Sequence, residues 1–201
     1  MNKKAFIFIG RSGSGKGTQA RLLQECLKDI EREKDIIYLE TGEEFRHFLK
    51  EDGYTQTLSR KIMDEGKLQP DFLAILMWSR KMIDTVKEDV HLILDGTPRQ
   101  LREAYVLEKA LEFYNYKDIH IIYPNVSRTW SEERLMARGR SDDKDPGDIK
   151  ARLDWYDSQV NPVVEYYRSN PMYKFHDING EQSIENVHKE VKEKTGLENG
   201  N

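Results

Sequence analysis

Residues Gly10–Gln19, GRSGSGKGTQ, decide how the rest of the chain is interpreted. This stretch follows an apolar run, Ala5–Ile9, and precedes a segment with helical spacing, which is the setting of a phosphate-binding loop. Its glycines let the backbone curl so that N–H groups face inward, and Lys16 supplies a positive charge for phosphates. A chance glycine-rich turn is the alternative. Because strand, lysine and helix are in register, the stretch predicts a nucleotide site.

The loop departs from the common pattern G-x-x-x-x-G-K-[ST], because Gly17 stands where a hydroxyl residue follows the lysine. That hydroxyl ordinarily binds Mg²⁺ directly. Gly17 has no side chain, so we expect Mg²⁺ to be held through water and the nucleotide phosphates, near Asp95 and Thr18. Such an arrangement suits an enzyme whose Mg²⁺ arrives with a nucleotide substrate.

Composition narrows the class of protein. A chain of 201 residues is long enough for one globular domain, and 34% charged residues with a net charge of -4 predict a well-solvated protein that does not bind nucleic acid. The single cysteine, Cys26, excludes an internal disulfide, leaves zinc without thiolate ligands, and suits a buried structural thiol. Without a signal-peptide pattern or an apolar stretch of roughly 20 residues, we expect a cytoplasmic protein that binds no membrane.

Short β-branched or aromatic runs alternate with segments of helical spacing. The five runs that predict strands are Ala5–Ile9, Ile36–Leu39, Leu92–Leu94, Ile119–Tyr123 and Tyr173–Ile178. Strands that alternate with helices indicate a parallel sheet covered on both faces. The sequence therefore predicts an α/β fold, a three-layer α/β/α phosphate-loop domain with a five-stranded parallel sheet.

Two insertions interrupt this alternation. Residues 42–88 hold more chain than one crossover needs, and residues 139–147, GRSDDKDPG, form a charged turn between helices. The helix that follows, at about 148–168, contains Pro162, where we expect it to bend or restart.

Further segments carry a family resemblance. TGEEFR (Thr41–Arg46), GKLQPD (Gly66–Asp71) and DGTPR (Asp95–Arg99) occur in that order, before a segment rich in arginine. Together with the glycine loop, they resemble the motifs of the adenylate kinase family of nucleoside monophosphate kinases, at matching spacings over nearly the whole chain. The short turn at 139–147 resembles the short-lid type, which has no zinc.

The resemblance implies transfer of a phosphoryl group from ATP to a nucleoside monophosphate, with AMP favoured, by a monomer that uses Mg²⁺. The implied ATP-binding residues are Gly13, Ser14, Gly15, Lys16, Gly17, Thr18, Arg134, Arg138 and Gln182. The implied acceptor-binding residues are Thr41, Gly42, Arg46, Lys67, Leu68, Gln69, Gly96, Arg99, Glu103, Arg140 and Arg152. The implied catalytic residues are Lys16, Arg99, Arg138, Arg140 and Arg152.

The resemblance also implies how the single domain, residues 1–201, is divided. We expect a core of residues 1–41, 72–138 and 148–196, an acceptor-binding insertion at 42–71 and a short lid at 139–147. Within the lid, three roles are open for Asp142 and Asp143: they brace the lid arginine, they bind the donor ribose, or they form a solvated turn.

These residue types suit phosphoryl transfer for a physical reason. The acceptor oxygen is already ionised, so the protein has to position two polyanions and neutralise charge, and no general base is needed. Arginine suits this task because its guanidinium binds phosphate in a bidentate way. Solvated helix residues remain the alternative for Arg134 and Lys67. Arg99 argues against that alternative, because it follows Asp95 at the end of a buried strand, where α/β sheets bind ligands.

Two residues near the acceptor base depart from the family pattern. Thr97 replaces an aromatic residue, and Glu103 replaces the glutamine with which adenylate kinases read the base. Glutamine both donates and accepts hydrogen bonds, whereas a carboxylate only accepts. Glu103 therefore either selects a base with two donors, such as guanine or a protonated cytosine, or faces solvent. Gln100 could substitute for it in another helix register.

Three functions are consistent with the sequence. The first is an ATP-dependent AMP kinase, and the second is a kinase for CMP, UMP, GMP or another small acceptor. The third is a nucleotide-binding regulator that has the fold without turnover. A regulator would be expected to lose some of the arginines, and this chain retains the set.

Overall fold

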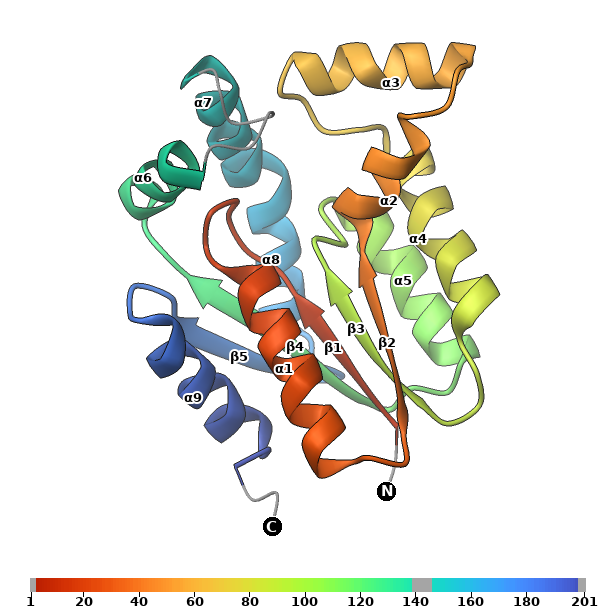
Figure 1. Cartoon of the computed structure of the whole chain (residues 1–201), viewed down its shortest axis with the longest axis vertical. Coiled ribbons are helices and arrows are strands. Elements are labelled where there is room, and N and C mark those ends of the chain that lie inside the picture. Colours follow the sequence, from red (N-terminus) through yellow and green to blue (C-terminus); the bar gives the residue numbers. More distant parts are fainter. Residues whose placement is uncertain (1–2, 139–145, 199–201) are drawn as a thin grey trace.

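The computed structural model describes residues 3–138 and 146–198. Its centre is a sheet of five parallel strands, in the spatial order β2-β3-β1-β4-β5 (Figure 1). The strands are β1 (Lys4–Phe8), β2 (Asp35–Glu40), β3 (Val90–Asp95), β4 (Asp118–Asn125) and β5 (Lys174–Asn179). Each predicted run overlaps one of these strands, so the prediction of a five-stranded parallel sheet is confirmed.

Helices cover both faces of the sheet and complete the predicted three layers (Figure 1). α1 (Lys16–Ile30) and α9 (Ile184–Thr195) pack on one face. The other face is covered by α4 (Asp71–Thr85), α5 (Leu101–Phe113) and α8 (Asn161–Ser169).

The central strand β1 shows why the layers form. Phe6 and Phe8 point into the cluster with α1 and α9, whereas Ala5 and Ile7 point into the cluster on the opposite face. All four side chains are fully buried, as the period of two along a strand requires when both faces are covered. Burying a side chain as large as that of Phe8 stabilises the fold by about 1.5–3 kcal/mol.

The first insertion is helical. It contains α2 (Thr41–Phe48) and α3 (Tyr54–Asp64) and leads into α4. Phe45 of α2 packs on Leu73 and Ala74 of α4 in a small separate cluster. The second insertion lies between α6 (Arg128–Arg138) and α7 (Pro146–Trp155). Most of the expected lid, with Arg140, Asp142 and Asp143, lies outside the described residues.

The helix expected at 148–168 is interrupted near Pro162, where a bend or restart was predicted. α7 ends at Trp155, a π-helical turn spans Tyr156–Val160, and α8 begins at Asn161. Pro162 stands in the first turn of α8, where its missing N–H has no helical partner to lose. Cys26 on α1 is only half-buried, so the expectation of a buried thiol was wrong, because its place on α1 is at the margin of the packed face.

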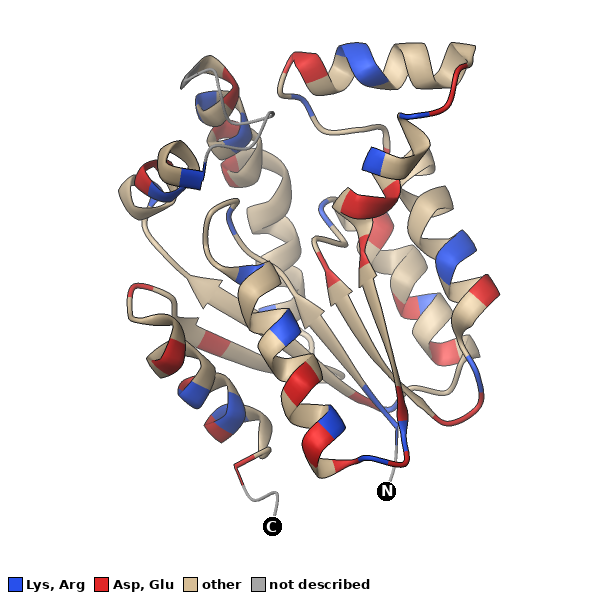
Figure 2. Cartoon of the chain, in the orientation of Figure 1, with Lys and Arg blue, Asp and Glu red and all other residues tan. Residues whose placement is uncertain are grey.

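Acidic and basic residues are interspersed along the outer helices α1 and α9 (Figure 2). These helices therefore present mixed charge and not one continuous basic face. None of the helices in the described part of the chain is long and apolar enough to span a membrane.

A pair of histidines lies between β4 and β5, under the α1 and α9 layer. The ring of His120 stacks between Phe6 and His176, with centroids 5.1 and 5.2 Å away, and its Nδ1 is 2.9 Å from His176 Nε2. His120 Nε2 is 3.0 Å from Asp118 Oδ1. Burial lowers the pKa of His120 from 6.5 to about 4, although Asp118 opposes this shift. The fold therefore favours the neutral ring.

This pair predicts a loss of stability in acid. The unfolded chain takes up a proton near pH 6.5 and the folded chain only near pH 4, so stability is lost as the pH falls between these values. At pH 5 the loss from His120 is about 2 kcal/mol. Urea unfolding at pH 7.5 and pH 5 should show a smaller pH effect for His120→Gln than for the wild type. Equal pH effects in the two proteins would refute this role.

Candidate active site

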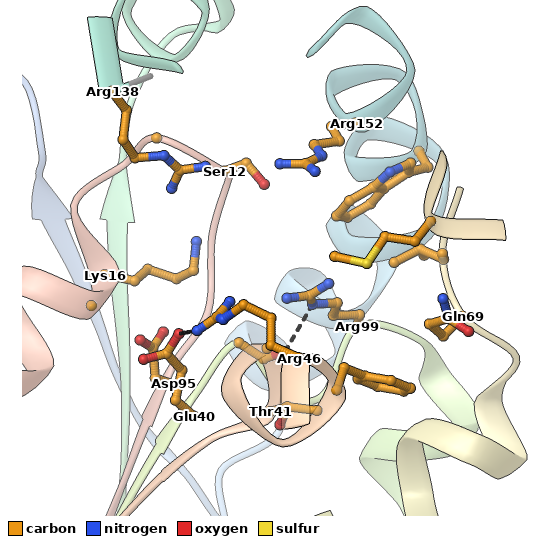
Figure 3. A pocket seen from close by; sticks show the side chains of 18 of the residues that line it. Ser12, Lys16, Glu40, Thr41, Arg46, Gln69, Asp95, Arg99, Arg138 and Arg152 are labelled. Carbon is orange, nitrogen blue, oxygen red and sulfur yellow. Dashed lines mark hydrogen bonds and ion pairs between the residues drawn. The ribbon is translucent and has the colours of Figure 1, made fainter. Parts of the chain in front are cut away.

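A cavity of about 680 Å³ lies at the carboxyl ends of β1 and β3 (Figure 3). The chain leaves β1 to one side for β2 and β3, and to the other side for β4 and β5. Parallel sheets bind ligands at such a switch point, because strand ends and helix amino termini meet there. The walls come from the phosphate loop, the insertion of α2 and α3, α6 and α7.

The phosphate loop is held against α6. Gly13 has a φ of +85°, and a Cβ added there would lie 2.8 Å from Ser131 O. Gly15 has nearly the same backbone conformation, with a φ of +88°, but no atom lies within 4 Å of the Cβ position. Glycine is therefore needed at position 13 for space as well as for conformation, and at position 15 for conformation alone.

Lys16 begins α1 and projects into the cavity (Figure 3). Its Nζ donates hydrogen bonds to Gly10 O at 2.8 Å and to Arg11 O at 2.6 Å. Its pKa is lowered to about 8, chiefly by burial and to a smaller extent by Arg99 and Arg138, while Asp95 opposes the shift. A phosphate bound next to Lys16 Nζ would raise the pKa of the lysine again, because a nearby negative charge favours the protonated form.

Asp95 ends β3 beside the loop and is 7% exposed. Tyr38 Oη donates to its Oδ2 at 3.0 Å, and burial raises the pKa of this carboxyl while Lys16 opposes the shift. A Cβ on Gly17 would lie 3.0 Å from the same Oδ2. The missing side chain at position 17 thus leaves space for the Asp95 carboxylate.

The oxygen donors near the loop suit Mg²⁺. Asp95 and Thr18 both line the cavity, and Mg²⁺ prefers carboxylate, hydroxyl and water oxygens. The described residues contain no group of three or more His, Cys, Asp or Glu that could hold a metal ion. This donor set fits an ion that keeps most of its water and phosphate ligands.

Arg46, Arg99 and Arg152 reach the cavity across from Lys16, whereas Arg138 reaches it from the side of the phosphate loop (Figure 3). Arg46 Nη2 is 2.7 Å from Glu40 Oε1, and Arg99 Nε donates to Gly96 O at 2.8 Å. Burial lowers the pKa of Arg99, and the carboxylate of Glu103 opposes this shift. Thr41 Oγ1 is buried beside them, without a hydrogen-bond partner among the described residues. These groups form a second cluster of cationic and hydrogen-bonding side chains at the cavity, distinct from the phosphate loop.

Most of the predicted site residues line this one cavity. They are Gly13, Gly15, Lys16, Gly17, Thr18, Thr41, Gly42, Arg46, Lys67, Leu68, Gln69, Asp95, Gly96, Arg99, Glu103, Arg134, Arg138 and Arg152. Two other predicted residues lie elsewhere: Ser14 is buried beneath the loop, and Gln182 Nε2 donates to Asn179 O and Glu190 between β5 and α9. Arg140 lies outside the described residues.

Glu103 is 2% exposed, so the alternative that it faces solvent was wrong. Its Oε2 accepts a hydrogen bond from Thr97 Oγ1 at 3.1 Å, and its Oε1 accepts one from Arg99 N at 3.3 Å. Burial raises the pKa of this carboxyl, and Arg99 opposes the shift. Gln100 Nε2 instead donates to Gln69 O at 3.4 Å. The two departures from the family pattern, Thr97 and Glu103, therefore contact each other.

Three other predicted side chains line the cavity but are engaged with neighbours. The Gln69 amide exchanges hydrogen bonds with Ser59 at 2.7 and 2.9 Å. Lys67 is 2.6 Å from Glu65 Oε2, and the Arg134 guanidinium lies 4.6 Å from the ring centroid of Trp130. A ligand would have to compete with these contacts.

Sequence reasoning missed Trp155, which lines the cavity from α7. Its Nε1 donates to Gly66 O at 3.0 Å, and its ring lies 5.7 Å from the Arg99 guanidinium. Trp155 stands three residues after Arg152, and helical spacing puts both on one face. This spacing from Arg152 could have indicated that Trp155 lines the site. Glu40 and Arg21 also line the cavity and were not predicted, because neither belongs to a recognised motif.

Comparison with known proteins agrees with this geometry. The sequence profile of the family described as "Adenylate kinase" matches residues 8–172. The chain belongs to the adenylate kinase family. It is 32% identical to "Adenylate kinase 1" of Nostoc sp., across 94% of this chain and 97% of that protein. It is 33% identical to "Adenylate kinase 1" of Synechocystis sp. across 92% of each, and 31% identical to an "Adenylate kinase" of Prochlorococcus marinus across 96% and 98%. The family resemblance inferred from the motifs is confirmed.

The loop of this family member predicts unequal effects of two matched substitutions. Gly13→Ala and Gly15→Ala both place a side chain at a positive φ, which costs about 1–2 kcal/mol. Only Gly13→Ala also drives its Cβ against Ser131 O, so its unfolding free energy should fall by a further 1–3 kcal/mol or so. Urea unfolding of the nucleotide-free variants measures the difference. Equal destabilisation would mean that the loop is not packed on α6 in this way.

Proposed function

We propose that this protein transfers the γ-phosphoryl group of ATP reversibly to a nucleoside monophosphate, with AMP favoured. One observation carries the proposal. Lys16 in the phosphate loop, with Arg138 beside it, and a separate group of arginines, Arg46, Arg99 and Arg152, face the same cavity (Figure 3). A cavity with cationic groups on opposite walls suits two polyanions that meet in the middle.

The chain's own residues supply position and charge. The backbone of the phosphate loop and Lys16 would hold the β- and γ-phosphates of ATP. Arg46 and Arg99 would hold the acceptor phosphate, while Arg138 and Arg152 stabilise the charge of the group in transfer. Mg²⁺ near Asp95 and Thr18 would neutralise phosphate charge. The monophosphate oxygen is the nucleophile in its ionised form, so no side chain has to remove a proton.

The proposal also covers the movement of the two insertions, the donor base, the oligomeric state and the location in the cell. We propose that the insertion at 42–71 and the lid at 139–147, with Arg140, close over both substrates and exclude water. Arg134 and Gln182 are proposed to lie near the donor base. A monomeric state and a cytoplasmic location stay predictions, which sedimentation and cell fractionation would check.

A second candidate acceptor follows from Glu103. Its buried carboxylate stands in the acceptor wall with Thr97, where it offers only hydrogen-bond acceptors while it is ionised. Adenine presents one donor and one acceptor along its base-pairing edge, whereas guanine presents two donors. GMP, and CMP when its base is protonated, are therefore expected to compete with AMP better than in a site that contains glutamine. A regulator without turnover is disfavoured, because the predicted site arginines that the structure describes, Arg46, Arg99, Arg134, Arg138 and Arg152, all line the cavity.

Lys16→Met tests the phosphate-loop assignment. Methionine keeps the unbranched chain but removes the charge that stabilises the transferring group, a loss of several kcal/mol in comparable sites. We expect a folded protein whose phosphoryl transfer falls by at least about a thousandfold in a coupled assay with ATP and AMP. Circular dichroism and thermal unfolding control for folding. Near-normal turnover in the folded variant would contradict the assignment of residues 10–19 as the phosphate-binding loop.

Glu103→Gln tests the acceptor. The substitution exchanges one oxygen for an NH₂ at nearly constant volume, and Thr97 Oγ1 can then accept a hydrogen bond instead of donating one. A mismatched buried polar contact costs roughly 1–3 kcal/mol, so preference for AMP over the other monophosphates should rise about tenfold.

The measurement is kcat/KM for AMP, CMP, UMP and GMP in both proteins, with ATP as the donor. Identical ratios in wild type and variant would mean that Glu103 does not read the base.

A further inference from the structure

Arg11 belongs to the phosphate loop, but its side chain does not line the cavity. Its guanidinium lies 4.3 Å from the ring centroid of Tyr156, and its Nη1 donates to Asp157 Oδ1 at 2.6 Å. Tyr156 and Asp157 open the π-helical turn that follows α7. Two segments that lie 146 positions apart in the sequence are thus joined behind the phosphate loop.

The backbone of Arg11 is equally engaged. Its carbonyl oxygen accepts hydrogen bonds from Lys16 Nζ at 2.6 Å and from Ser14 N at 3.2 Å. The side chain is anchored on the π-helical turn and the carbonyl is anchored on the loop. Holding the Arg11 side chain therefore helps to fix the carbonyl that orients Lys16.

The support on which Arg11 rests is itself rigid. Tyr156 is 1% exposed, and its hydroxyl is 3.1 Å from that of Tyr123 on β4. Asp157 also accepts a hydrogen bond from Arg128 Nη1 of α6 at 3.0 Å. The Arg11 side chain therefore contacts a buried tyrosine and a carboxylate that accepts hydrogen bonds from two arginines. Such a contact is better ordered than an isolated surface ion pair.

The same turn is continuous with the opposite wall of the cavity. Trp155, immediately before it, contacts the insertion through Gly66 O, and Arg152 lies on the same face of α7. The acceptor side of the cavity is thus held to the turn by contacts that do not involve Arg11. The link to Arg11 keeps the phosphate loop in register with that side.

We propose that Arg11 and Asp157 are a positioning pair, which pre-orders the phosphate loop for ATP and holds it in register with α7. The reason is entropic. Glycines give this loop more conformational freedom than other residues would, and a loop that is ordered before binding loses less freedom when ATP binds. The proposal rests on the proposed function in that ATP is taken as the ligand of the loop.

Asp154 supplies a matched control. It lies one turn before Asp157, is similarly exposed, and also accepts a hydrogen bond from Arg128, at 2.6 Å. Its other partner is Lys150, so it does not touch Arg11. Asp157→Asn and Asp154→Asn therefore remove the same charge from the same network, but only Asp157→Asn weakens the anchor of the loop.

The experiment measures binding of a non-hydrolysable ATP analogue by calorimetry, then KM for ATP and for the monophosphate. Asp157→Asn should raise the Kd of the analogue and KM for ATP about two- to fivefold, the range expected for loss of a partly exposed ion pair, with KM for the monophosphate unchanged. Asp154→Asn should leave all three values at the wild-type level. Arg11→Gln should weaken binding further, because it also removes the contact with Tyr156.

A double-mutant cycle completes the test. If the pair acts as one unit, Arg11→Gln with Asp157→Asn should bind the analogue no more weakly than Arg11→Gln alone. Additive effects, equal effects of the two Asn variants, or an equal rise in both KM values would overturn the proposal. If the wild type transfers phosphate to no monophosphate, the proposed function fails, but calorimetry still decides whether the pair orders the loop.

Discussion

Mutual repulsion between cations around the cavity is the constraint on which the site depends. Lys16, Arg46, Arg99, Arg138 and Arg152 all face a space of about 680 Å³. Without a bound anion, the fold has to hold these charges near one another. The lowered pKa values of Lys16 and Arg99 are one sign of that repulsion, since other cations contribute to both shifts after burial.

Anionic and carbonyl groups relieve the repulsion at each cation separately. Glu40 pairs with Arg46, the loop carbonyls of Gly10 and Arg11 accept from Lys16, and Gly96 O accepts from Arg99. Each partner accepts a hydrogen bond from a cation that faces the cavity. The arginines and the lysine are thus held close to the position of use, which lowers the reorganisation needed when substrates bind.

The sequence predicted the parts of this arrangement that are local. The phosphate loop, the buried strands and Asp95 at a strand end follow from spacing and hydrophobicity over a few residues. Most predicted cleft residues were found to line the cavity for the same reason, because motifs at strand ends of a parallel sheet meet at one edge. Three contacts were not predicted: Thr97 with Glu103, Trp155 with Gly66, and Arg11 with Asp157. Each joins residues that are brought together by the packing of helices and loops, and the spacing of residues along the sequence does not reveal such packing.

Thr97 and Glu103 show what such a contact changes in an argument from family patterns. Taken singly, each looks like the loss of a family residue, an aromatic in one case and a glutamine in the other. In the structure the Thr97 hydroxyl donates to the Glu103 carboxylate, and Arg99 N donates to its other oxygen. The smaller residue supplies the hydrogen bond that a buried carboxylate requires, whereas an aromatic ring would leave that oxygen without it. The two departures are therefore one change, which keeps a negative group in the acceptor wall beside Arg99. Since Arg99 is the arginine that we propose to bind the acceptor phosphate, the pair would link recognition of the base to the strength of the phosphate site.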